Sequence, residues 1–220
     1  MLNLDSSTLL SRIITLVIAL TVHEFAHAWV ATRLGDETPR QYGRLTLNPL
    51  AHLDILGSIM LVVAGFGWAK PVPVNPYALG KRSSAGLMWV SLAGPLSNFL
   101  LAPLAAMPIR FGIVSAGAFF VSSSGGFLPT LGEFLSEFIF LNLLLMLFNL
   151  IPIAPLDGDK IAGYFAPPPI SRLLDVIRPY GPIVLMALLF IAPRFGVDIF
   201  SWIMVPAFPN LWNLLIGSNL

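Results

Sequence analysis

The stretch that decides the fold is Thr21-Val22-His23-Glu24-Phe25-Ala26-His27-Ala28-Trp29. It lies near the end of an apolar segment that begins at about Leu9 and contains one charged residue, Arg12, before the motif. A segment of this length and hydrophobicity can cross a lipid bilayer as a single helix. We therefore predict a transmembrane helix over residues 8–32 that carries two histidines and a glutamate inside the membrane.

On a helix, His23 and His27 are separated by four positions and lie on the same face. Two imidazoles at this spacing can hold one tetrahedral zinc ion and leave positions for a third protein ligand and a water molecule. Glu24 projects about 100° away from His23, so its carboxylate can reach that water rather than the metal. A purely structural role for these residues is the alternative, but an ionisable side chain in lipid costs on the order of a few kcal/mol. The pattern therefore indicates a zinc hydrolase with Glu24 as the general base.

The composition indicates a membrane protein. Apolar residues make up 56% of the 220 residues, charged residues only 10%, and the mean hydropathy is +0.83. A soluble globular domain usually carries about 25% charged residues. A net charge of +1 and the absence of any basic run give no support for a nucleic-acid partner. Because the chain has no cysteine, a zinc site must use His, Asp and Glu.

Three further parts of the chain are apolar enough to join a helix bundle. Residues 85–107 and 131–151 each reach the length that spans a bilayer. Prolines interrupt the apolar tail, so we predict one or two imperfect helices over residues 183–192 and 197–216. The part that follows Gly158 is predicted to be a polar loop as far as Arg178. The fold class is therefore an all-α membrane protein, a bundle of transmembrane helices.

Two short segments do not suit a helix that crosses the membrane. Residues 55–67 are apolar but number only 13, so we predict a re-entrant or buried piece. Residues 70–76 contain three prolines, which forbid a helix and favour an extended, β-like segment. Such a segment can pair with an unfolded substrate strand by edge-strand addition.

The distribution of basic residues predicts the orientation in the cell membrane. Most of them fall in two loops, between residues 32 and 85 and after residue 151, whereas Arg110 stands alone in the loop between these two. By the positive-inside rule, the two basic loops are cytoplasmic and the N-terminus lies outside. The multi-pass protein would then carry His23, Glu24 and His27 in the half of their helix that faces the cytoplasm.

A zinc site on this helix needs a third protein ligand. Val30 and Arg33 occupy the Gly and His positions of the longer motif that supplies a third histidine, so that arrangement is excluded. Glu37 and His52 follow nearby, but both fall in a polar loop outside the apolar span. Asp157 comes directly after the apolar run 131–151, on the same side of the membrane as the motif. It is the favoured ligand, and the alternative is a simple Asp-Gly turn.

Two motifs occur in order along the chain. The first is His23-Glu24-Phe25-Ala26-His27, and the second is Asn149-Leu150-Ile151-Pro152-Ile153-Ala154-Pro155-Leu156-Asp157-Gly158. Together they resemble the site-2 protease family of intramembrane zinc metalloproteases. Residues 67–75 and 93–98 also look like segments of that family, so the resemblance covers about residues 10–165. One departure is Ile55, which stands where the family commonly has a proline after the aspartate.

The resemblance implies transmembrane helices around a zinc site inside the bilayer. The chain would be one protease domain over residues 1–220, with a helical tail at 179–217 and no inserted PDZ-like domain. Zinc would be held by His23, His27 and Asp157, and Glu24 would act as the general base. Asn149 and Asn98 would hydrogen-bond the substrate backbone or the developing oxyanion, or would only hold two helices together. The expected substrate is a single-span transmembrane protein.

Two other functions remain open at this point. The first is a non-proteolytic membrane protein that keeps a metal for binding or structure, and it predicts bound zinc without turnover. The second is a zinc hydrolase that acts on another membrane substrate, such as a lipid or a prenylated peptide. The Leu156-Asp157-Gly158 motif and the extended segment at 70–75 favour the protease.

Overall fold

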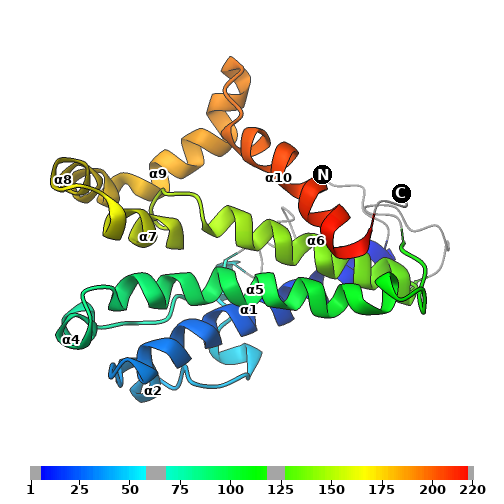
Figure 1. Cartoon of the computed structure of the whole chain (residues 1–220), viewed down its shortest axis with the longest axis horizontal. Helices are drawn as coiled ribbons and strands as arrows, with labels where there is room; N and C mark the ends of the chain where they lie inside the picture. The colour runs from blue at the N-terminus through cyan, green and yellow to red at the C-terminus, as the bar shows by residue number, and fades with distance from the viewer. Residues whose placement is uncertain (1–5, 58–67, 118–126, 218–220) are drawn as a thin grey trace.

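The computed structural model describes residues 6–57, 68–117 and 127–217, and in these ranges the chain is mostly helical and contains no sheet. Three long helices lie against one another: α1 (Ser6–Arg33), α5 (Gly86–Arg110) and α6 (Leu131–Asn149). Figure 1 shows their axes roughly aligned through the body of the molecule, with α5 antiparallel to α1 and α6. All three are long and apolar enough to cross a membrane, as is the run of helical turns over Pro168–Phe195.

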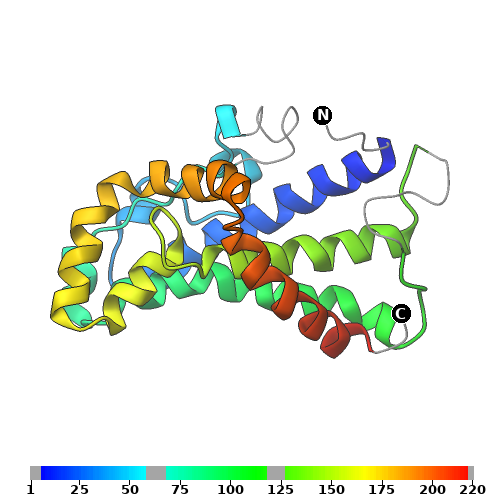
Figure 2. The ribbon, with the colours of Figure 1, turned by 90° about the horizontal axis from the view of Figure 1, so that it is seen from above.

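Shorter elements connect and follow the long helices. Those on the first connections are α2 (Thr38–Gln41), the 3₁₀ turn η1 (Pro49–Ala51) and α4 (Pro76–Arg82). After α6 come α7 (Asp157–Phe165), α8 (Pro168–Ile177), η2 (Arg178–Tyr180), α9 (Gly181–Met186), η3 (Ala187–Ile191), η4 (Ala192–Phe195) and α10 (Ile199–Ile216). Figure 2 shows α10 crossing back over the bundle, where it contacts α5 and α6.

The structure confirms the helices expected at 8–32, 85–107 and 131–151 to within a few residues. It also confirms an extended segment after residue 68, which joins the preceding loop through an antiparallel bridge between Leu53 and Ala69. The re-entrant piece predicted at 55–67 lies largely outside the described residues, because the description stops at residue 57 and resumes at residue 68.

The polar loop predicted as far as Arg178 is wrong, because α7 and α8 occupy this part of the chain. Proline at the first helical positions of α8 favours initiation, since its missing N–H would have no partner there. Apolar residues at helical spacing then give α8 one apolar face, at Ile170, Leu173, Leu174 and Ile177. The sequence prediction missed this periodicity because Arg172 and Asp175 stand among the apolar residues and make the segment look polar overall.

Helix α5 lies at the centre because small residues let its neighbours approach closely. Ala102 and Ala106 are almost completely buried against Ile139 and Leu143 of α6, and Trp212 of α10 closes the same cluster. Close packing of small side chains is how helices associate where lipid removes the hydrophobic driving force. This core cluster therefore lies between α5, α6 and α10, and α1 packs against α5 outside it.

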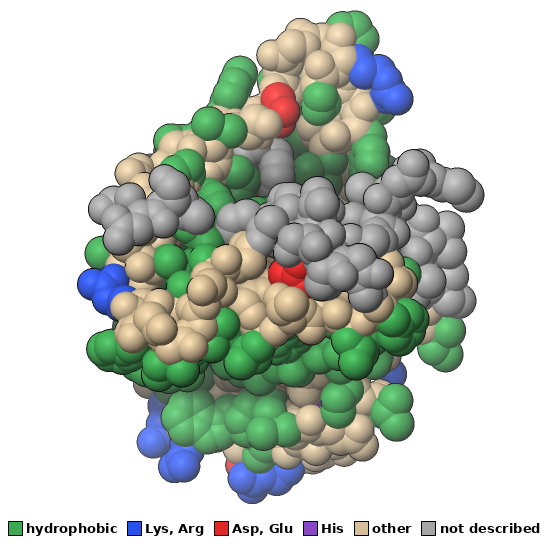
Figure 3. All heavy atoms as spheres, turned by 90° about the vertical axis from the view of Figure 1, so that its right-hand side faces the viewer, with side chains coloured by type: hydrophobic (Ala, Val, Ile, Leu, Met, Phe, Trp, Pro, Cys, Tyr) green, Lys and Arg blue, Asp and Glu red, His purple; other side chains and the backbone are tan. Residues whose placement is uncertain are grey.

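The outer surface of the bundle is apolar. Leu96, Leu100 and Leu104 of α5 are each about half exposed, and they recur every four residues along one side of the helix. Figure 3 shows a band of hydrophobic side chains across one end of the molecule, with the Lys and Arg side chains toward the edges of the view. An exposed apolar surface of this extent suits contact with lipid rather than with water.

A buried ion pair joins α1 to α6. The Arg12 Nε donates to Glu137 Oε1 at 2.9 Å, and the two side chains are only 9% and 4% exposed. Charges in a membrane are tolerated when they pair inside the bundle. Removing one partner of such a pair is costly because the other charge remains in a medium that cannot solvate it.

We expect Glu137→Leu to destabilise the protein by about 3–5 kcal/mol, and the double variant Arg12→Met/Glu137→Leu to recover most of that loss. Equilibrium unfolding in mixed micelles, followed by circular dichroism, measures both. The control is Glu37→Leu, which removes the exposed Arg40–Glu37 pair and should change stability little. If Glu137→Leu and Glu37→Leu destabilised the protein equally, the buried pair would not have the importance that we assign to it.

Candidate metal centre

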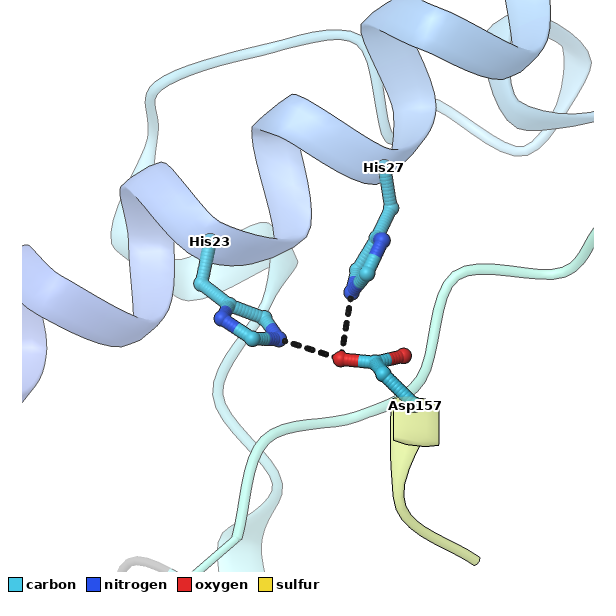
Figure 4. A group of neighbouring side chains, drawn as sticks. All are labelled: His23, His27 and Asp157. Carbon is cyan, nitrogen blue, oxygen red and sulfur yellow. Dashed lines mark ion pairs between the residues drawn. The ribbon is translucent and has the colours of Figure 1, made fainter. Parts of the chain in front are cut away.

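Three predicted ligands meet at one point. His23 and His27 lie one turn apart on α1, and both imidazoles are buried. Asp157, the first residue of α7, directs its carboxylate at them (Figure 4). Its Oδ2 lies 3.2 Å from His23 Nε2 and 3.3 Å from His27 Nε2. Residues separated by 130 positions in the chain thus present one oxygen and two nitrogens to a common centre.

The geometry of these donor atoms fits a zinc ion. Two ligand atoms bound at about 2.0–2.1 Å to one tetrahedral zinc stand about 3.3 Å apart, which matches both distances from Asp157 Oδ2. That oxygen is buried and accepts no hydrogen bond, although a buried polar atom normally has a partner. The three residues form the one group with metal-ligand spacing in the part of the chain that the structure describes.

Hydrogen bonds behind the histidines fix their orientation. His27 Nδ1 lies 2.6 Å from the carbonyl oxygen of Val90, and His23 Nδ1 lies 2.6 Å from Asn98 Oδ1. A carbonyl oxygen can only accept, so each Nδ1 carries the proton and donates it. Each Nε2 is therefore left free to bind a metal, and contacts with α5 determine the tautomer of both histidines.

The bond to His23 continues through a second amide. Asn98 Nδ2 donates to Asn142 Oδ1 at 2.9 Å and, more weakly, to the Ala19 carbonyl at 3.4 Å. Asn142 Nδ2 in turn donates to the Phe138 carbonyl at 2.9 Å. The chain of bonds thus links α1, α5 and α6, with both amides fully buried. Sequence reasoning missed Asn142, and its only signal was that it is the one polar residue between Phe138 and Phe148.

Asp157 is held in place by the way α6 ends. The prediction treated Asp157 as the end of the apolar segment, but α6 stops at Asn149 and a separate short helix begins with Asp157. A Cβ on Gly158 would overlap the carbonyl oxygens of Leu150 and Ile151, so only glycine lets α7 start this close to the end of α6.

A cavity of about 460 Å³ opens in front of the three ligands. Glu24 and Asn149 both line it, as predicted for a base and for a residue that contacts substrate. Glu24 Oε2 accepts a hydrogen bond from the backbone N–H of Val72 at 3.2 Å, which ties the base to the extended segment. The remaining wall is mainly apolar and includes Leu20, Leu87, Val90, Leu145, Phe148 and Leu156.

Other residues considered from the sequence lie elsewhere. Asn98 is behind His23 and does not line the cavity. His52 is fully buried in the loop after α2, where its Nε2 bonds the Thr46 carbonyl, and Glu37 pairs with an exposed arginine. Asp54 accepts a bond from the Gly57 N–H. None of these joins the group formed by the histidines and Asp157.

Comparison with known proteins gives the family. The chain is 44% identical over 181 residues to the Bacillus subtilis protein named "putative zinc metalloprotease YwhC", a match that covers 82% of this chain and 80% of that protein. The chain belongs to the site-2 protease family of zinc metalloproteases. The sequence resemblance is therefore confirmed, and with it a metalloprotease with zinc as its cofactor in a membrane setting.

Two mycobacterial members of the family carry the name "putative zinc metalloprotease Rip2". The Mycolicibacterium smegmatis protein is 32% identical over 179 residues, covering 79% of this chain and 64% of its own length. The Mycobacterium tuberculosis protein is 31% identical over 186 residues, covering 80% of this chain and 65% of its own length. The chain thus spans slightly less than two thirds of these relatives. No family model and no solved structure matches it.

Because α5 approaches the candidate ligands so closely at Gly94, adding a single methyl group there should weaken zinc binding. A Cβ on Gly94 would lie 2.5 Å from His23 Nε2 and closer still to His27 Nε2, in the space that the metal needs. We expect Gly94→Ala to lower zinc affinity by on the order of 100-fold or more, although alanine favours a helix over glycine. Chelator competition measures the affinity. Gly80→Ala, where the added Cβ meets no atom within 4 Å, is the control.

The assignment of Asp157 as the third ligand predicts that its removal causes loss of bound zinc. We expect Asp157→Ala to release zinc on purification, because two imidazoles alone make too weak a site. Atomic absorption of the purified protein measures the bound metal, with Asp175→Ala as an exposed aspartate for comparison. Full retention of zinc in Asp157→Ala would remove this residue from the ligand set.

Proposed function

We propose that this protein hydrolyses peptide bonds of single-span transmembrane proteins, within or beside the membrane. The observation that carries the proposal is that the ligand group and Glu24 line one cavity between helices able to cross a bilayer. A soluble peptide would not need a cleavage site enclosed by apolar walls, whereas a segment leaving the lipid would meet it directly. The membership of a metalloprotease family supports the peptide bond as the target.

Each residue of the site has a chemical task in this proposal. His23, His27 and Asp157 hold the zinc ion, which when bound polarises the scissile carbonyl and makes water a better nucleophile. Glu24 accepts the proton from the attacking water and later passes it to the leaving amine. The Val72 N–H keeps the carboxylate of Glu24 directed at the cavity.

The substrate must enter as an extended chain. A helix has all its backbone groups paired, so it unwinds locally before a peptide bond can reach the ligands. The extended segment at 70–75 borders the cavity through Pro71, Val72 and Val74, and an unwound substrate can add to it as a strand. Backbone pairing of this kind tolerates many side chains, while the apolar walls select segments that come from lipid.

Asn149 and Asn98 have different surroundings, so we propose different roles for them. Asn149 is half-buried on the cavity wall, where its Nδ2 donates to the Leu145 carbonyl at 3.0 Å and its amide can turn toward a developing oxyanion. Asn98 is fully buried and bonded to His23 and Asn142. We assign Asn98 to the orientation of His23 in place of substrate contact.

The orientation in the membrane is also part of the proposal. The basic residues on the loops between α1 and α5 and after α6 favour a cytoplasmic position for both, with the N-terminus outside. The site would then receive water from the cytoplasm. The proposed protease domain extends over residues 1–220, with the helical tail as part of it.

The experiment that tests the function uses purified protein in detergent with a library of single-span substrates. We expect Glu24→Gln to keep zinc but to abolish cleavage detected by mass spectrometry, because an amide cannot take the proton. The control is Glu37→Gln, which changes an exposed glutamate in the connection between α1 and α2 and should cleave normally. Cleavage that persists in Glu24→Gln, or in the presence of a zinc chelator, would reject the mechanism.

The proposed role of Asn149 predicts a split in the kinetics. We expect Asn149→Ala to lower kcat by on the order of 10²–10³ while KM changes little, because an oxyanion donor acts mainly in the transition state. Asn210→Ala is the matched control, since Asn210 is exposed on α10 and makes the same bond to the carbonyl four residues earlier. A rise in KM with unchanged kcat would instead indicate ground-state binding.

A further inference from the structure

A bidentate ion pair lies beside the metal ligand on α7. Arg178, at the start of η2, donates from Nε to Asp159 Oδ2 at 2.7 Å and from Nη2 to Asp159 Oδ1 at 3.2 Å. The Asp159 side chain is 2% exposed, so this carboxylate is buried. Paired donors of a guanidinium matched to both oxygens of a carboxylate fix orientation as well as distance.

The same arginine has a second, different partner. Its Nη1 donates to Asp175 Oδ1 at 2.6 Å, but the Asp175 side chain is 60% exposed. An exposed pair within three residues contributes little to stability. The contact with Asp159 is therefore the one that can hold two elements together, because loss of Arg178 would leave the buried Asp159 carboxylate without its bidentate partner.

The buried pair acts on the turn that carries Asp157. Asp159 follows the ligand by two residues in the first turn of α7. Gly158, between them, packs so tightly on the end of α6 that no Cβ fits. The first turn of α7 is thus held from one side by α6 and from the other by Arg178.

A second close contact strengthens the connection at the same corner. A Cβ on Gly181 would overlap the carbonyl oxygen of Ala154, in the loop that leads into α7. Residues 178–181 therefore press on both the loop and the helix that position the ligand. By contrast, α8 buries none of its residues, and only 6% of an 18-residue apolar window within Pro168–Phe195 is buried. The corner at 178–181 is where this part of the tail is attached next to the site.

Lys160 cannot replace the arginine in this role. Its Nζ lies 3.5 Å from Asp159 Oδ2, but the two residues are neighbours on the same helix. A single ammonium there offsets charge without tying α7 to another element. Among the residues that the structure describes, Arg178 is the one side chain that links the carboxylate of Asp159 to a later element of the chain.

We propose that Arg178 is a positioning residue for the metal ligand Asp157, and that its pair with Asp159 couples the C-terminal tail to the metal centre. The proposal rests on the assignment of Asp157 as a zinc ligand, which is part of the proposed function. When the pair is intact, the first turn of α7 is fixed and Oδ2 stays at ligand distance from both histidines. When it is broken, α7 loses its outer support and the third ligand moves.

The test compares four variants of the full chain: Arg178→Met, Arg178→Lys, Asp159→Asn and Asp175→Asn. Zinc affinity is measured by chelator competition, and ligand geometry by the visible d–d absorption of the cobalt-substituted protein. Loss of a residue that supports a metal ligand weakens affinity by about 10–100-fold. We expect this loss and an altered cobalt spectrum in Arg178→Met and Asp159→Asn, a smaller change in Arg178→Lys, and none in Asp175→Asn.

Wild-type zinc affinity and cobalt absorption in Arg178→Met and Asp159→Asn would overturn the proposal, whatever happens to cleavage. An Asp175→Asn variant as impaired as Asp159→Asn would also overturn it, because the effect would then come from α8 as a whole. If Arg178→Met does not fold, Arg178→Lys and Asp159→Asn decide. A wild-type protein that binds zinc but cleaves no substrate would contradict the proposed protease and leave these metal readouts valid.

Discussion

The metal centre depends on how closely α5 approaches α1 at Gly94. With no side chain at this point, the backbone of α5 lies against the two imidazoles, and Val90 and Asn98 on either side of the glycine reach the Nδ1 atoms. A larger residue would separate the helices and break both bonds together. The small residues Ala19, Ala28 and Ala31 on the facing side of α1 are completely buried, which allows the same approach. The close packing of α5 on α1 therefore also determines the orientation of His23 and His27.

Polar groups inside this bundle are satisfied across helices rather than by solvent. Asn98 and Asn142 pass a chain of hydrogen bonds from α6 to the ligand His23, and Arg12 and Glu137 join α1 to α6 nearer the other end. In lipid an unsatisfied polar group costs several kcal/mol, so these contacts specify register as well as stability. The bonds that hold α6 in place are continuous with those that orient the metal ligand.

Hydropathy and residue spacing predicted those features of the fold that depend only on residues close together in the sequence. Hydropathy located α1, α5 and α6, and the four-residue spacing of His23 and His27 placed both ligands on one face before any fold was known. Asp157 followed from the order of the segments. The short helices α7 and α8 were not predicted, because their apolar residues alternate with charged residues and prolines. The partners Asn142 and Arg178 could not be predicted either, since each acts on a residue of another helix through a contact that no motif or spacing encodes.

The three ligands differ in how their positions are secured. His23 and His27 share a helix of 28 residues, so their spacing is set by the helix itself and needs only orientation from α5. Asp157 opens a helix of nine residues that does not cross the membrane, and its position depends on contacts with α6 and with the tail. A site built from one rigid pair and one supported ligand responds to whatever moves that support. The position of Asp157 therefore depends on residues of the C-terminal part of the chain as well as on α6.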